Sequence, residues 1–166
     1  MTDPVAPQDD GRDESLTERM DRNWVDLLQE MRVLQTGVQI LAGFLLTLPF
    51  QARFASLDGY QIGLYLINVI VAALTTASIL LPVSLHRRLF RQGLKATLVA
   101  SADTIVKVSL AGVMLLSLGT TSLVFDVTAG RTAGVIAAIG LLAVLLLLMV
   151  LIPGTLRRKA LKEKPQ

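Results

Sequence analysis

Residues 32–50, RVLQTGVQILAGFLLTLPF, decide the fold, because this stretch is nearly apolar along its whole length and closes on a Leu-Pro-Phe sequence. A helix needs about 20 such residues to cross the ~30 Å hydrocarbon layer of a bilayer. Three more runs of similar length and composition follow along the chain. The predicted membrane-spanning helices therefore occupy residues 33–50, 61–81, 103–125 and 132–152.

The composition also indicates a membrane protein. Of the 166 residues, 52% are hydrophobic and 17% are charged, whereas about one quarter of a soluble domain is usually charged. Only helices and closed barrels satisfy their backbone in lipid, and the two-residue alternation of barrel strands is absent from this sequence. The sequence therefore predicts an all-α fold, an integral membrane four-helix bundle over residues 33–152.

The N-terminal residues differ from these runs. Residues 1–14 are acidic, contain two prolines and are predicted to form a disordered tail. Residues 15–34 carry apolar side chains at helical spacing, and Ser15 with Glu18 has the spacing of a capping box. We expect an amphipathic helix that precedes the bundle on the cytoplasmic side and lies along the interface. Trp24 is its expected interface anchor.

Basic residues gather where they would set the topology of a membrane protein. One group lies between the second and third predicted spans and comprises His86, Arg87, Arg88, Arg91 and Lys95. The other is the basic tail, residues 153–166. The positive-inside bias then places this inner-surface cluster and both termini in the cytoplasm, with the spans in a bacterial plasma membrane. Because the charges flank apolar runs, we expect no nucleic-acid partner.

The acidic face of the amphipathic helix is predicted to find a basic partner. Segment 13–32 holds six acids and three arginines, so anionic lipid would repel it. Two alternatives are open. The acids meet Arg87, Arg88, Arg91 or the basic tail, or they meet a partner protein.

Three amides of the predicted spans are candidates for polar groups embedded in the membrane: Gln35, Gln39 and Asn68. An amide in hydrocarbon needs a partner. The two readings are hydrogen bonds between helices and a polar path for ions or protons. Amides do not titrate, which favours the first. Small residues in the same spans indicate either packing within the bundle or a dimerisation face.

Asp103 and Lys107 are the charged pair nearest to a span. Their i,i+4 spacing allows them to pair along one helix face. In one reading they form an interfacial pair, with the lysine reaching toward water. In the other, the helix starts near Lys95 and carries both charges into the membrane. Pro82 is expected to bend or stop the preceding helix.

No motif of an enzyme is present. The chain has no cysteine and a single histidine, and no Ser–His–Asp or His–carboxylate metal spacing is found. We therefore expect no catalytic residues, no cofactor and no metal.

The sequence resembles a known family in three places: residues 23–54 (NWVDLLQEMRVLQTGVQILAGFLLTLPFQARF), 80–95 (LLPVSLHRRLFRQGLK) and 122–130 (SLVFDVTAG). Together they resemble a family of actinobacterial membrane proteins, a domain of unknown function with four predicted spans. The resemblance implies this architecture over nearly the whole chain from about residue 20. Some relatives carry a sodium:proton antiporter label. Such an activity needs a titratable carboxylate in the membrane, and Asp103 and Asp126 come nearest to that position.

The expected function is that of a non-enzymatic accessory or scaffold protein of the plasma membrane. Its expected partners are the lipid bilayer and either a second copy, in a homo-oligomer, or a larger membrane protein complex. The alternative is a small ion- or proton-coupled transporter that uses Asp103 and Lys107.

Overall fold

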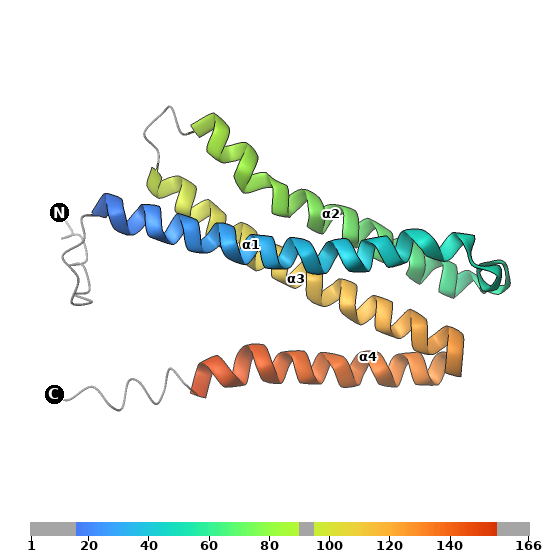
Figure 1. Ribbon diagram of the computed structural model, residues 1–166. Coiled ribbons are helices and arrows are strands. Elements are labelled where there is room, and N and C mark those ends of the chain that lie inside the picture. The colour runs from blue at the N-terminus through green and yellow to red at the C-terminus, as the bar shows by residue number, and fades with distance from the viewer. Residues whose placement is uncertain (1–15, 90–94, 156–166) are drawn as a thin grey trace.

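The computed structural model describes residues 16–89 and 95–155 (Figure 1). The prediction of an all-helical fold with four helices is confirmed for this part of the chain, which contains no strand. The four long helices are α1 (Leu16–Thr47), α2 (Gly59–Leu89), α3 (Lys95–Ala129) and α4 (Arg131–Leu146). The shorter segments are η1 (Leu48–Phe50), η2 (Ala52–Ser56) and the π-helical η4 (Leu147–Leu151).

Several sequence predictions fall outside the described residues. They concern the tail 1–14, Ser15 of the expected capping box, Arg91 of the basic cluster and residues 156–166 of the basic tail.

Helix α1 joins two predicted segments into one. It runs without a break from Leu16 to Thr47, through both the amphipathic segment and the first predicted span. Pro49 in the short helix η1 follows, and Gln51 adopts an extended conformation that starts the connection to α2. At ~1.5 Å per residue the 32 residues of α1 reach about 48 Å, well beyond the ~30 Å of a hydrocarbon layer.

Two other helices are longer than the predicted spans. Pro82, expected to bend or stop the helix, lies inside α2, which continues to Leu89. Helix α3 begins at Lys95, as in the alternative with an early start, and runs to Ala129. At the end of α4 the chain stays helical through Pro153 to residue 155. The widened π turns of η4 just before this proline relieve the clash that its ring would make with Met149.

The helices alternate in direction, with the α1–α2 connection and the α3–α4 turn at the same end (Figure 1). We call this the loop end. Helix α2 packs most extensively on α3, and α1 packs on both. Helix α4 packs on α3 and makes no comparable contact with α1 or α2.

The buried side chains repeat every seven residues on each of the three central helices. The repeats are Met31, Val38 and Leu45 on α1, Tyr65, Ala72 and Ile79 on α2, and Ser109, Leu116 and Leu123 on α3. A seven-residue repeat keeps one face of a helix against its neighbour in a left-handed arrangement, which is the usual packing of helices in membrane bundles.

The outside of the molecule is apolar. Four helical stretches are long and apolar enough to cross a membrane: Arg22–Phe50, Gly59–Pro82, Thr104–Ala129 and Arg131–Thr155. Large apolar side chains on these stretches point outward, among them Leu74 and Ile136, which are 64% and 65% exposed. A surface of this kind is unfavourable in water and favourable in lipid, which indicates a membrane protein.

Candidate functional site

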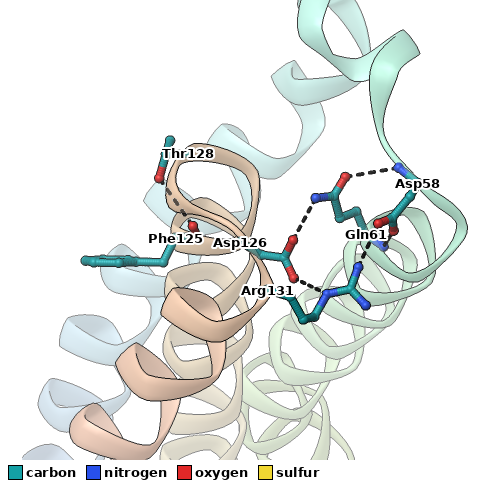
Figure 2. Close-up of polar contacts among 6 residues, drawn as sticks. All are labelled: Asp58, Gln61, Phe125, Asp126, Thr128 and Arg131. Carbon is teal, nitrogen blue, oxygen red and sulfur yellow. Dashed lines mark hydrogen bonds and ion pairs between the residues drawn. The ribbon is translucent and has the colours of Figure 1, made fainter.

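Four polar residues converge at the loop end. They form what we call the loop-end cluster: Asp58, Gln61, Asp126 and Arg131 (Figure 2). Asp58 directly precedes α2 and Gln61 lies in its first turn, whereas Asp126 lies in the last turn of α3 and Arg131 begins α4. The cluster therefore joins both connections of the loop end.

Local sequence explains how these residues are held. Asp58 precedes α2 and its carboxylate accepts a hydrogen bond from the Gln61 backbone N–H at 2.9 Å. The Gln61 side chain accepts in return from the Asp58 N–H at 3.0 Å. This is a reciprocal capping box built on an aspartate and a glutamine.

The α3–α4 turn places the other two residues. Gly130 has a φ of +91°, a conformation that side chains disfavour. Its N–H donates to the Asp126 carbonyl at 2.9 Å. This single residue lets α4 start directly after α3, so Arg131 lies beside the last turn of α3.

The buried carboxylate of Asp126 is the centre of the cluster. Asp126 is 4% exposed, and both oxygens of its carboxylate accept hydrogen bonds. Gln61 Nε2 donates to Oδ1 at 2.7 Å, and Arg131 Nε donates to Oδ2 at 2.7 Å. A buried carboxylate needs such charge-assisted partners, so these contacts explain why an acid is tolerated here.

Arg131 connects this buried site to the surface. Its Nη2 forms an ion pair with Asp58 Oδ2 at 2.7 Å, and its guanidinium lies 3.8 Å from the centre of the Tyr60 ring. The Gln61 backbone N–H lowers the pKa of the exposed Asp58 carboxyl. The positive charge of Arg131 lowers it further, while a partial loss of hydration opposes both effects.

A second set of contacts fixes the α1–α2 connection. Arg53 Nη2 donates to the Val127 carbonyl of α3 at 3.0 Å. The rings of Phe54 and Tyr65 meet edge to face, with centres 5.1 Å apart. The connection is therefore fastened to α2 and α3 by polar and aromatic contacts together.

The polar contacts continue between α2 and α3, along two of the stretches that are long and apolar enough to cross a membrane. Gln61, Asn68 and Thr75 follow one another every seven residues on α2. They face Asp126, Gly119 and Gly112, which follow the same spacing on α3. The Asn68 Oδ1 and Thr75 Oγ1 atoms occupy the space that a Cβ atom on the facing glycine would need. We call these three pairs the α2–α3 seam.

Gln61 bonds across the seam to Asp126, whereas Asn68 and Thr75 bond within their own helix. Asn68 Nδ2 donates to the Leu64 carbonyl at 3.0 Å, and Thr75 Oγ1 donates to the Val71 carbonyl at 2.7 Å. The interhelical bond expected of Asn68 is thus not made by its amide nitrogen. Its side chain contributes by close packing on Gly119 instead.

The other predicted polar residues stand apart. Gln35 is half-buried beside a cavity of about 260 Å³ that Met31, Ile79 and Pro82 also line. Gln39 is exposed on α1, and no hydrogen bond of its amide is found among the described residues. Neither glutamine reaches Asn68, which lies buried on α2.

The remaining candidates lie toward the opposite end of the bundle. Trp24 is half-buried on α1, and Lys107 is exposed on α3. Both have an interaction partner. Asp103 lies in helical backbone, one turn before Lys107, but its side chain is not among those described. The same holds for four residues of the basic cluster: His86, Arg87, Arg88 and Lys95.

None of the four members of the loop-end cluster was among the predicted site residues, and Asp126 was named only as one of the two carboxylates nearest to the membrane. A signal for part of the cluster existed, because Asp58 and Gln61 repeat the spacing of Ser15 and Glu18. The link to Asp126 had no comparable signal, since Gln61 and Asp126 are 65 residues apart. Chemically, the cluster neutralises a buried acid and fastens helices together.

Comparison with known proteins places this architecture in a family. Neither the curated proteins nor the solved structures provide a match. The family model that matches covers residues 13–153, which includes all four long helices and the loop-end cluster. The chain therefore belongs to a family of unknown function (DUF6328).

Proposed function

We propose that this protein is a non-enzymatic accessory or scaffold protein of a bacterial plasma membrane, which self-associates or joins a larger membrane complex. The observation that carries the proposal is the open arrangement of the helices. Among the described residues α4 packs along α3 and meets the start of α2 through Arg131, so the four helices do not enclose one common core. Faces of α1 and α4 remain available to partners in the membrane.

The rigid loop end supports the same role. Ionised groups there bind one another and the backbone, as Asp126, Arg131 and Asp58 do. Such contacts hold helices at fixed positions and thus present fixed surfaces, as a scaffold requires. In our proposal the loop end faces the outside of the cell and both termini face the cytoplasm, in line with the basic residues near the opposite end.

The continuity of α1 bears on the N-terminal segment. A straight continuation of a membrane-spanning helix leaves the bilayer instead of turning into its plane. We therefore propose that the first turns of α1 project into the cytoplasm, with Asp26 and Glu30 exposed on them. Their partners in this proposal are the arginines of the basic cluster or an acid-binding surface of another protein.

A small ion- or proton-coupled transporter that uses Asp103 and Lys107 is the second candidate. Two buried hydroxyls on the same helix favour it. Ser109 Oγ and Thr120 Oγ1 have no hydrogen-bond partner among the described residues, and such groups bind water or ions where a path exists. Gradient-driven ion flux in proteoliposomes that Asp103→Asn abolishes would make this the leading function.

The leading proposal is tested by the state of the full chain in native membranes. Purification in a mild detergent, followed by mass measurement and identification of co-purifying chains, is expected to give a species heavier than one chain. A single chain of 17.9 kDa without a stable partner, both after purification and after cross-linking in membranes, would contradict the proposal.

A further inference from the structure

We propose that one face of α1 pairs two copies of this chain in the membrane. This inference rests on the proposed function and names its partner. The face, which we call the Gln39 face, consists of Thr36, Gln39, Gly43 and Thr47, which follow one another at spacings of three and four residues. All four are exposed.

Gln39 is the group that requires a partner. It lies eleven residues before Phe50 in the membrane-spanning stretch, which places it about 16 Å below that end, near the middle of the hydrocarbon layer. The side chain is too short to reach water from this depth. An amide in hydrocarbon is strongly unfavourable unless it is hydrogen-bonded.

The other polar groups of the face are already satisfied. Thr36 Oγ1 donates to the Arg32 carbonyl at 3.0 Å, and Thr47 Oγ1 donates to the Phe44 carbonyl at 2.7 Å. The Gln39 amide has no such bond among the described residues. Gln39 is therefore the residue of this face whose side chain still needs hydrogen-bond partners.

A second copy supplies the matching group at the matching depth. All copies of a multispanning protein insert in the same orientation, so α1 of a neighbour is parallel and its Gln39 stands at the same level. The amide carries both donors and acceptors. Two Gln39 side chains related by a twofold axis can therefore donate to each other.

The space around Gly43 allows the two helices to come close. Nothing lies within 4 Å of the position that a Cβ atom on Gly43 would take. One turn beyond Gln39, the backbone is thus bare and approachable, as in pairs of membrane helices that meet through glycine. The opposite side of α1 carries the buried residues Val38 and Leu45, each 1% exposed, so pairing leaves the core intact.

Disulfide cross-linking tests the contact directly, because the chain has no cysteine of its own. In full-length protein in native membranes, Gly43→Cys and Gln39→Cys are expected to give disulfide-linked dimers on mild oxidation, since the paired Cα atoms would lie within about 7 Å. Gly37→Cys is the matched control. It also has open space around it but points away from the Gln39 face, and it is expected to stay monomeric.

Dimer affinity in bilayers of synthetic phospholipid gives the second measurement. Gln39→Leu removes two reciprocal hydrogen bonds and is expected to raise the dissociation constant about tenfold. Gly43→Leu is expected to raise it at least as much by holding the helices apart, whereas Gly37→Leu leaves it within about twofold. Since Gly43 has open space, its variant keeps the fold, which thermal unfolding checks.

Three results would overturn the inference. Dimers that persist with unchanged affinity in both variants and lack the cross-links would place self-association on another face, and the proposed function would stand. A disulfide from Gln39→Cys to a cysteine of a different protein would identify a heteromeric complex, which again leaves the proposed function intact. A chain that is monomeric in membranes and without partners would remove both.

Discussion

Asp126 shows how a single acid can be kept within a lipid-facing bundle. Its two oxygens accept hydrogen bonds from Gln61 and Arg131. Arg131 also donates a hydrogen bond to the exposed carboxylate of Asp58. Arg131 thus links the buried carboxylate of Asp126 to the exposed carboxylate of Asp58. Loss of the central carboxylate would leave Gln61 Nε2 without its acceptor inside the protein.

We expect Asp126→Ala to lower the free energy of unfolding by about 1–3 kcal/mol, the usual consequence of leaving a buried partner unsatisfied. Asp126→Asn retains one acceptor oxygen and is expected to cost less. Unfolding in mixed micelles, followed by circular dichroism, measures both variants. Thr132→Ala, which removes an exposed side chain of α4, is the control. Equal effects of Asp126→Ala and Thr132→Ala would show that the cluster is not a stabilising contact.

Asp58 gives the loop end a pH dependence with a defined sign. Because the folded protein lowers the pKa of Asp58, the unfolded chain takes up this proton at a higher pH than the folded one. The stabilisation is therefore complete above the unfolded pKa of about 3.9 and is lost as the pH falls through the lower folded pKa.

The measurement compares the wild-type chain with Asp58→Asn, which can still cap α2 but cannot carry the charge. The difference in melting temperature is expected to be largest near neutral pH and to shrink below about pH 4, where the wild-type carboxyl is protonated. A difference that stayed constant from pH 7 to pH 3 would exclude the Asp58 charge as its source.

At the scale of the helices, the α2–α3 seam joins two helices by one hydrogen-bonded pair, Gln61 with Asp126, and by two polar side chains that pack on glycines. A Cβ atom on Gly119 would collide with the Asn68 side chain, and one on Gly112 with that of Thr75. Lipid gives little drive for helices to associate, so this close approach supplies much of the contact.

Gly119→Ala is accordingly expected to cost about 1–3 kcal/mol through overpacking. Asn68→Ala in the same chain vacates the space and should restore part of the loss, giving a coupling that a double-mutant cycle detects. Gly140→Ala is the control, because nothing lies within 4 Å of its Cβ position. Additive effects of Gly119→Ala and Asn68→Ala would mean that the two residues do not meet.

The helices themselves could be predicted because length and apolar composition are properties of each segment alone. How the segments pair is a different kind of information. The seven-residue spacing of Gln61, Asn68 and Thr75 is visible in the sequence, but nothing local indicates that these residues face Asp126 and two glycines of α3. In the same way, the absence of a breaker before residue 33 allowed either a bent or a continuous α1, and the structure contains the continuous helix.

At the scale of the whole molecule, the loop end and the opposite end differ in character. The loop end is tied by short contacts between the connections, as Arg53 with Val127 and Arg131 with Asp58 illustrate. Toward the opposite end, α2 and α4 lie apart (Figure 1). A helix bundle that is held together at the loop end allows partner chains to pack between or beside its helices at the opposite end, as a scaffold would require.

The orientation of this body in the membrane follows from the proposal that the loop end faces outward. Cysteines introduced at the exposed Ala55 and Ala129 of the loop end, one at a time, are expected to react in intact cells with a maleimide that cannot cross the membrane. Thr155→Cys, at the exposed end of the last helix, should react after the cells are opened and not before. The wild-type chain has no cysteine and therefore serves as the unlabelled control.

Labelling of Thr155→Cys in intact cells, with Ala55→Cys and Ala129→Cys protected, would show the opposite orientation. The basic residues would then lie outside, against the positive-inside bias on which the cytoplasmic assignment rests.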